Sequence, residues 1–178
     1  SGGAGTVAFR TGVGLLTQDG FQVHQYVMRD YPEERYLLES IAAVADQFDM
    51  LCTFNGRTFD VPLLRSRFLM NRMNPSVLDK PHIDLLPMAR RLWKLRLGRC
   101  NLSRLEEVVF GEPRLDDLPG SEVPERYFSY IKTRDFSLLV DVLEHNRQDV
   151  ASLCRLLTHM TDMYQAPENQ GHEQAVYS

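Results

Sequence analysis

Asp60 lies where an expected strand ends and an expected helix begins. The apolar run at 50–54 is short and ends at the turn pair Asn55-Gly56, which is typical of a buried strand. A helix is expected from Thr58, its N-cap, through Phe68. In an open α/β sheet ligands bind at this edge, so Asp60 is a candidate functional residue. The alternative is that its carboxylate only stabilises the positive end of its own helix.

His145 and Asp149 are four residues apart and therefore share one face of a long expected helix. Apolar Val142 and Leu153 lie on the same face, which turns both polar groups toward the interior or a cleft. A carboxylate buried without a partner is costly, and a metal ion or another cation would explain its position. The alternative is a simple hydrogen-bonded pair of helix residues without a catalytic role.

A basic block interrupts an otherwise acidic chain. Residues 57–104 carry eleven basic and three acidic side chains, a net charge of +8, whereas the whole chain has −4. Within the block, Arg90, Arg91 and Lys94 accompany Trp93 on an expected helix. Cations beside an aromatic ring favour a nucleic-acid-binding surface. The alternative is a buried tryptophan beneath a solvated basic face.

The elements that position these residues predict an α/β domain with a mixed sheet. The hairpin turn Asp19-Gly20 separates the first two strands, and the sheet is thin for the amount of helix. The segment 112–124 is rich in acidic residues, Pro and Gly and is expected to be a loop. A loop is expected at 1–5, strands at 6–16, 21–28, 50–54 and 82–85, and helices at 32–48, 58–68, 88–97, 101–111, 125–132 and 135–163.

Length and composition predict one globular domain over 1–163, followed by a polar tail or linker at 164–178. No apolar run approaches a membrane span, and no signal peptide is recognisable. Three widely spaced cysteines, Cys52, Cys100 and Cys154, are expected to be free thiols. Free thiols indicate a reducing compartment, and we expect a cytoplasmic protein.

Taken together, the segments resemble a family. The run from Asn55 to Asp60 is similar to the second motif of the DEDD (DnaQ-like) 3′-5′ exonuclease superfamily, which has the ribonuclease H-like fold. That fold implies that the strand at 50–54 lies near the centre of the sheet. His145 and Asp149 stand where the third motif belongs. The resemblance covers about residues 5–160 and is closest to the YprB-type branch, on the segments 82–85, 90–93, 100–105 and 119–124.

The resemblance implies a nuclease that hydrolyses phosphodiester bonds of DNA or RNA with two Mg²⁺ or Mn²⁺ ions. Asp60 and Asp149 would be metal ligands, and His145 would take the proton of the attacking water. Asp84 is a weaker candidate for the same site, and a structural role is favoured for it. The residues implied in binding nucleic acid are Asn55, Gly56, Arg57, Arg90, Arg91 and Lys94.

Two departures from the family pattern stand out. His145 replaces the tyrosine of the proofreading type, and the first motif, Asp-x-Glu on the central strand, has no counterpart in this sequence. We therefore expect the chain to begin just after that strand and, taken alone, to be inactive. The alternative is a non-catalytic module that binds nucleic acid or protein. A third possibility, a phosphoesterase of small nucleotides, would act on mononucleotide esters but not on polymers.

Overall fold

The computed structural model describes residues 8–115 and 117–165. These residues have mixed α/β structure, which confirms the expected fold class. The expected N-terminal loop at 1–5 and the tail beyond 165 lie outside the described residues. The strands are β1 (Arg10–Thr17), β2 (Gly20–Val27), β3 (Leu51–Thr53) and β4 (His82–Asp84). The α-helices are α1 (Glu34–Ala45), α2 (Asp60–Met70), α3 (Leu85–Leu97), α4 (Leu102–Leu105), α5 (Val123–Thr133) and α6 (Ser137–Gln165).

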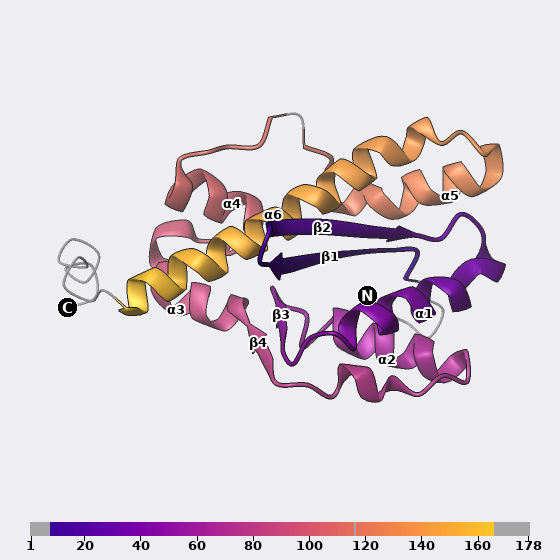
Figure 1. Cartoon of the computed structure of the whole chain (residues 1–178). Helices are drawn as coiled ribbons and strands as arrows, with labels where there is room; N and C mark the ends of the chain where they lie inside the picture. The colour runs from indigo at the N-terminus through magenta and orange to yellow at the C-terminus, as the bar shows by residue number, and fades with distance from the viewer. Residues whose placement is uncertain (1–7, 116, 166–178) are drawn as a thin grey trace.

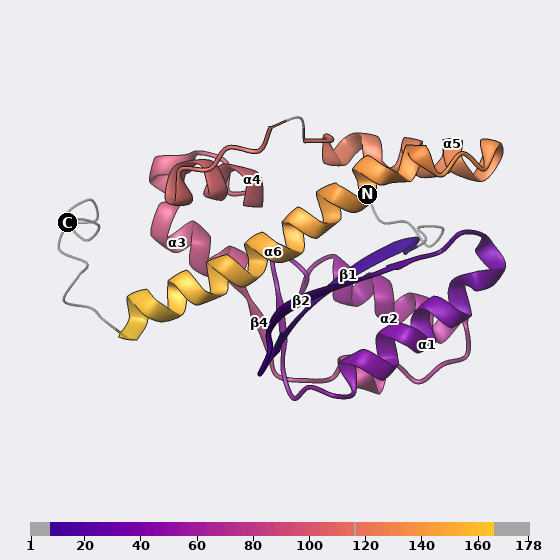
Figure 2. The same cartoon turned by 45° about the horizontal axis from the view of Figure 1, so that its top comes forward.

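The antiparallel hairpin β1–β2 is packed between helices. Its register runs from Arg10 opposite Val27 to Thr17 opposite Gly20, which confirms the expected hairpin. Figures 1 and 2 show α6 crossing one side of the hairpin, while α1 and α2 lie on the other side. None of the helices in the described ranges is both long and apolar enough to cross a membrane.

A glycine in β1 allows α6 to approach the hairpin closely. A Cβ atom on Gly12 would lie 2.5 Å from Asn146 Oδ1 and 2.6 Å from Val150 Cγ2, too close for any larger residue without a shift. Gln25 in β2 fixes the contact by donating to Leu143 O at 2.7 Å and to Asn146 Oδ1 at 3.0 Å. The segment of α6 that carries His145 and Asp149 is thus held directly over β1.

The strand at 50–54 does not occupy the centre of one continuous sheet, contrary to expectation. β3 pairs in parallel with β4 alone, with Cys52 opposite Ile83 and Thr53 opposite Asp84. In the described part of the chain, the strands therefore form two separate two-stranded sheets, one antiparallel and one parallel. The expected strand at 82–85 is confirmed, because three of its residues supply the partner of β3.

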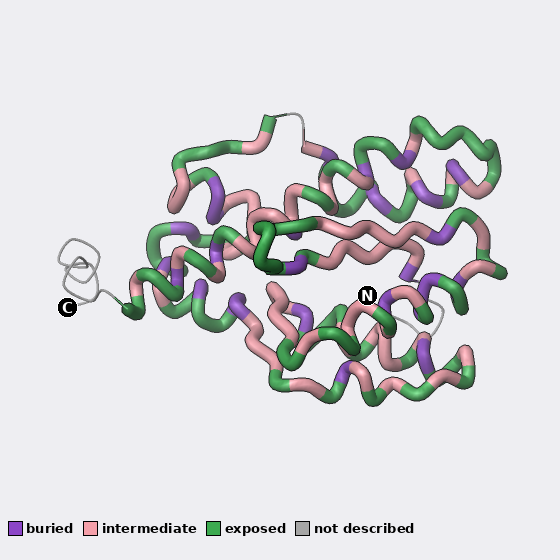
Figure 3. Tube along the Cα trace, viewed as in Figure 1, coloured by how far each residue is buried: buried purple, intermediate pink, exposed green. Residues whose placement is uncertain are grey.

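Two main apolar clusters hold these elements together. The first joins β2, α1, α2 and α5 around Met28, Phe68 and Tyr127, and Tyr127 Oη donates to Met28 O at 3.1 Å. The second packs α3 against the C-terminal half of α6 around Trp93 and Leu156. Figure 3 shows buried and exposed residues alternating along α3 and α6, as expected for amphipathic helices.

The start of α2 differs from the expectation in one detail. Asp60 is the first helical residue, one position later than a cap at Thr58 would give, and the N-cap is Phe59, which makes no side-chain capping bond. Thr58 is therefore not the cap. The turn is closed by backbone bonds instead, since Phe59 N donates to Asn55 O at 3.3 Å and Val61 N donates to Gly56 O at 2.9 Å.

We predict that Glu34→Gln destabilises the fold by about 3 kcal/mol at pH 7, because it breaks a largely buried ion pair. Glu34 accepts from Arg67 Nε at 2.6 Å and Nη2 at 2.7 Å, and the two side chains are only 10% and 12% exposed. Burial alone raises the pKa of Glu34, but the bonds from Arg67 and Asn71 outweigh it, so the folded pKa lies below the ordinary 4.5.

A lowered carboxyl pKa stabilises the fold above the unfolded-state value, and that contribution is lost as the pH falls through the folded-state pKa. Urea unfolding at a series of pH values should therefore show the difference between Glu34→Gln and wild type shrinking below pH 4.5. The control is Glu39→Gln, whose exposed pair with Arg35 is worth at most about 1 kcal/mol. An equal loss in both variants would contradict the prediction.

Candidate functional site

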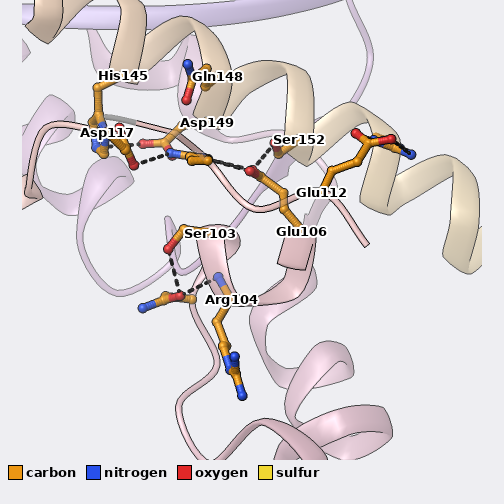
Figure 4. Close-up of polar contacts among 12 residues, drawn as sticks. Ser103, Arg104, Glu106, Glu112, Asp117, His145, Gln148, Asp149 and Ser152 are labelled. Carbon is orange, nitrogen blue, oxygen red and sulfur yellow. Dashed lines mark hydrogen bonds and ion pairs between the residues drawn. The ribbon is translucent and has the colours of Figure 1, made fainter. Parts of the chain in front are cut away.

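His145 and Asp149 contact each other on α6, as their spacing predicts (Figure 4). His145 Nε2 lies 3.4 Å from Asp149 Oδ2. The other ring nitrogen, Nδ1, lies 2.7 Å from Asp117 Oδ1. Asp117 belongs to the segment between a π-helical turn, Glu106–Phe110, and α5. The His145 ring is therefore held between two carboxylates, and its side chain is 14% exposed.

The buried guanidinium of Arg114 bonds to both carboxylates that flank His145 and to a third one, Glu106. Arg114, 6% exposed, donates to Glu106 Oε1 and Oε2 at 2.6 and 2.7 Å, to Asp149 Oδ1 at 2.9 Å and to Asp117 Oδ2 at 3.1 Å. Ser152 Oγ donates a hydrogen bond to Glu106 Oε1. Burial alone would lower the pKa of Arg114, but Glu106 and Asp149 outweigh it and raise that pKa above its ordinary value. Arg114 is therefore a permanent cation.

Glu106, Arg114 and Asp117 were not identified from the sequence. Glu106 lies in a π-helical turn, Glu106–Phe110, inside the segment expected to be a regular helix. Arg114 and Asp117 lie in the acidic segment expected to be a loop. The signal in the sequence was a single arginine within a run of acids, and nothing local shows which acids it contacts.

Asp60 and Asp149 interact electrostatically, although they lie on different helices. Asp60 is accessible to solvent, yet the surrounding protein atoms desolvate it enough to raise its pKa. The charges of Asp84 and Asp149 raise the pKa of Asp60 further, and Arg10 lowers it. Burial lowers the pKa of Arg10, and Asp149 and Asp60 partly offset that effect. Arg10 at the start of β1 is thus a cation within electrostatic range of both carboxylates.

Asp84 has the structural role that the sequence suggested. Its Oδ1 accepts from Asn55 N at 2.7 Å and from Leu86 N at 3.1 Å, and its Oδ2 accepts from Arg57 N at 3.1 Å. These bonds cap α3 and fix the turn after β3, where Asn55 has a φ of 66°. Arg57 Nη2 also donates to His82 O at 2.7 Å. The turn at 55–57 is therefore rigidly placed beside Asp60.

The basic residues of α3 form a separate surface. Arg90, Arg91 and Lys94 are exposed, and no carboxylate pairs with them among the described residues; the same holds for Arg96 and Arg99. Most arginines on other elements do form ion pairs. No hydrogen bond or ion pair in the described ranges links the α3 cations to Asp60, His145 or Asp149. Trp93 is buried beneath them with 2% exposure.

The oxygen atoms of Asp60 and Asp149 are ligands of the type that a hard divalent cation prefers, but two carboxylates form only part of a metal site. Within residues 8–115 and 117–165, no group of three or more His, Cys, Asp or Glu side chains is arranged to hold a metal ion. Mg²⁺ is often bound through one or two carboxylates, with waters and substrate phosphates completing its shell. Asp60, with its raised pKa, and Asp149, which raises it, are the carboxylates that a cation would stabilise.

Comparison with known proteins identifies relatives across almost the whole chain. A family model described as the RNase_H superfamily matches residues 1–161. The "Uncharacterized protein YprB" of Bacillus subtilis is 37% identical over 161 residues, which cover 90% of this chain. The chain spans 39% of the length of that relative.

We predict that Arg114→Met destabilises the fold by about 3–5 kcal/mol, because it leaves Glu106, Asp117 and Asp149 together without their shared cation. Urea unfolding at pH 7 measures the loss. The control is Arg147→Met on α6, whose pair with Glu144 is about half exposed and worth at most about 1 kcal/mol. A loss below about 1 kcal/mol for Arg114→Met would mean that the carboxylates separate freely without it.

Proposed function

Because the chain belongs to the RNase H superfamily, we propose that it is the nuclease domain of a metal-dependent enzyme that hydrolyses phosphodiester bonds of nucleic acid, as a 3′-5′ exonuclease. The observation that carries this proposal is that Asp149, which contacts His145 on α6, also acts electrostatically on Asp60. The two residues lie 89 positions apart in the sequence and on separate helices, yet the charge of one raises the pKa of the other. Like charges held together in this way are typical of functional sites, and a cation relieves their repulsion.

Asp60 and Asp149 would hold Mg²⁺ or Mn²⁺ through their carboxylate oxygens. When bound, divalent ions lower the pKa of a coordinated water and stabilise charge on the leaving oxygen. Arg10 is a cation near the same carboxylates and would neutralise part of their charge when no ion is bound. Its side chain would move aside, or turn toward a substrate phosphate, on ion binding.

His145 would accept the proton of the attacking water. Burial alone raises the pKa of Asp117, but His145 and Arg114 outweigh it and hold that pKa below its ordinary value. An ionised Asp117 accepts a hydrogen bond, so in the neutral form of His145 the proton would reside on Nδ1, and Nε2, 3.4 Å from Asp149 Oδ2, would be the nitrogen that accepts a proton. Nε2 points to the Asp149 side, where the water would stand. Asp117 is thus a positioning residue for the proposed base.

Nucleic acid would be bound by the turn after β3 and by α3. The backbone of Asn55, Gly56 and Arg57 is held in place beside Asp60, and Asn55 would orient the end of the substrate strand. The exposed cations Arg90, Arg91 and Lys94 would contact phosphates, which attract unpaired basic side chains. The free cysteines Cys52, Cys100 and Cys154 fit a reducing compartment, and we propose a cytoplasmic location.

The alternative proposal is a non-catalytic module that binds nucleic acid or a protein. It is favoured by the lack of a cluster of three or more metal-binding side chains in the described ranges. The unpaired cations of α3 would serve binding and catalysis equally well. Metal-dependent hydrolysis is therefore the property that separates the two proposals.

The test is a nuclease assay on the full-length protein, with whatever sequence its gene encodes on either side of these residues. We expect Mn²⁺- or Mg²⁺-dependent release of mononucleotides from labelled single-stranded DNA or RNA. Asp149→Asn and Asp60→Asn should each reduce the rate by roughly 10³-fold, since each removes an anionic metal ligand worth several kcal/mol in the transition state.

The matched control is Asp141→Asn, an exposed carboxylate on the same helix whose partner is Arg126. It should retain wild-type activity. A wild-type protein that binds nucleic acid but shows no hydrolysis with either ion would favour the non-catalytic module. Hydrolysis that survives in both Asp60→Asn and Asp149→Asn would contradict the proposed site.

A further inference from the structure

A pocket of about 520 Å³ opens at the end of α3, beside α4 and the segment that follows the π-helical turn. Its walls include apolar Leu97 and Pro113 and the cationic side chains of Arg99 and Arg104. Its volume lies within the range of roughly 300–1,000 Å³ that is common for small-molecule sites. None of the motif residues at 55–60 lines it.

The pocket adjoins the His145–Asp149 site through two shared residues. Arg114 and Asp117 line the pocket, and the same side chains bond to Asp149 and His145. Figure 4 shows Ser103 and Arg104 on one side of this network and His145 and Asp149 on the other. A ligand in the pocket would therefore lie next to the proposed catalytic residues without displacing them.

Three arginines and two carboxylates line the pocket, and because Glu107 and Asp117 are each already paired with an arginine, the remaining positive charge suits a phosphate. Arg99 is exposed and has no carboxylate partner among the residues that the structure describes. Arg104 donates to Glu107 at 2.6 Å, but the two side chains are 41% and 49% exposed, so the pair is weak and a phosphate could replace the carboxylate. Asn101 Oδ1 accepts from Ser103 Oγ and from Arg104 N, which leaves the Asn101 amide nitrogen free to donate.

Arg99 also continues the basic surface of α3. Four exposed cations precede it along the helix and, like Arg99, pair with no carboxylate in the described ranges; they are Arg90, Arg91, Lys94 and Arg96. A polyanion that follows this helix toward its C-terminal end arrives at the pocket. Both ends of α3 therefore adjoin the proposed site: Asp84 at its start holds the turn beside Asp60, and its C-terminal end opens on the pocket.

We propose that this pocket binds one nucleotide of a single-stranded nucleic acid, with its phosphate on Arg99 and Arg104 and its base or sugar against the exposed ring of Pro113. The proposal rests on the proposed nuclease function and adds a substrate-binding site to it. Single-strand sites typically combine a cationic track with surfaces that accommodate a base. The strand would run along α3 and enter the site beside Asp117.

Binding without hydrolysis tests the pocket separately from catalysis. Full-length protein in EDTA is titrated into a fluorescein-labelled oligothymidylate of about 12 nucleotides, within the usual range of single-strand site sizes, and anisotropy gives the Kd. Arg99→Glu should raise the Kd about 10-fold and lower the slope of log Kd against log salt by about one. Arg99→Gln should have a smaller effect of the same sign.

The control is Lys132→Glu on α5, which makes the same charge change at an exposed lysine outside the pocket. It should leave the Kd within about twofold of wild type, apart from the small general effect of net charge. Unlabelled thymidine monophosphate should displace the oligonucleotide more effectively than inorganic phosphate, because only the nucleotide fills the apolar wall.

The possible results separate the two proposals. If Arg99→Glu and Lys132→Glu weaken binding equally, or neither does, the pocket proposal is wrong, and the nuclease assay with Asp149→Asn still decides the proposed function. If inorganic phosphate competes as well as the nucleotide, the pocket is not a nucleotide site. A selective loss in Arg99→Glu together with preferential competition by the nucleotide supports the pocket, whether or not the protein hydrolyses the strand.

Discussion

The buried guanidinium of Arg114 is the interaction on which the arrangement of the site depends. It bonds to carboxylates from three parts of the chain: Glu106 in the π-helical turn, Asp117 before α5 and Asp149 on α6. Without a cation these carboxylates would repel one another in a poorly solvated position. With it, Asp117 is held where it can bond to His145. One arginine thereby fixes both the fold of its segment and the orientation of the proposed base.

On the other side of Asp149 the charges are not balanced in the same way. Asp60 has a raised pKa because protein atoms desolvate it and because Asp84 and Asp149 repel its charge. Arg10 compensates only in part, and its own pKa is lowered by burial. The carboxylate of Asp149 is thus neutralised on one side by its bond to Arg114. On the other side it acts on Asp60, whose negative charge is only partly compensated by Arg10. This asymmetry is the physical basis for proposing a divalent cation between the two aspartates.

The sequence predicted the features that depend on local pattern. The hairpin and the shared face of His145 and Asp149 follow from turn residues and helical periodicity. It did not predict the division into two small sheets, because pairing between strands is set by long-range packing. It also missed Arg114 and Asp117, since an arginine in a polar segment gives no indication of which distant acids it will meet.

The proposal that Asp60 and Asp149 hold divalent cations is tested most directly by the anomalous difference map of a crystal grown with Mn²⁺ and an uncleavable single-stranded oligonucleotide. We expect peaks for the bound ions, with a carboxylate oxygen of Asp60 and one of Asp149 each within about 2–2.5 Å of a peak, the usual range for hard cations. Arg10 should then have moved away from the two carboxylates. A map with no peak there, and with the Arg10 guanidinium bonded to both aspartates in the presence of Mn²⁺, would contradict a metal site at Asp60 and Asp149.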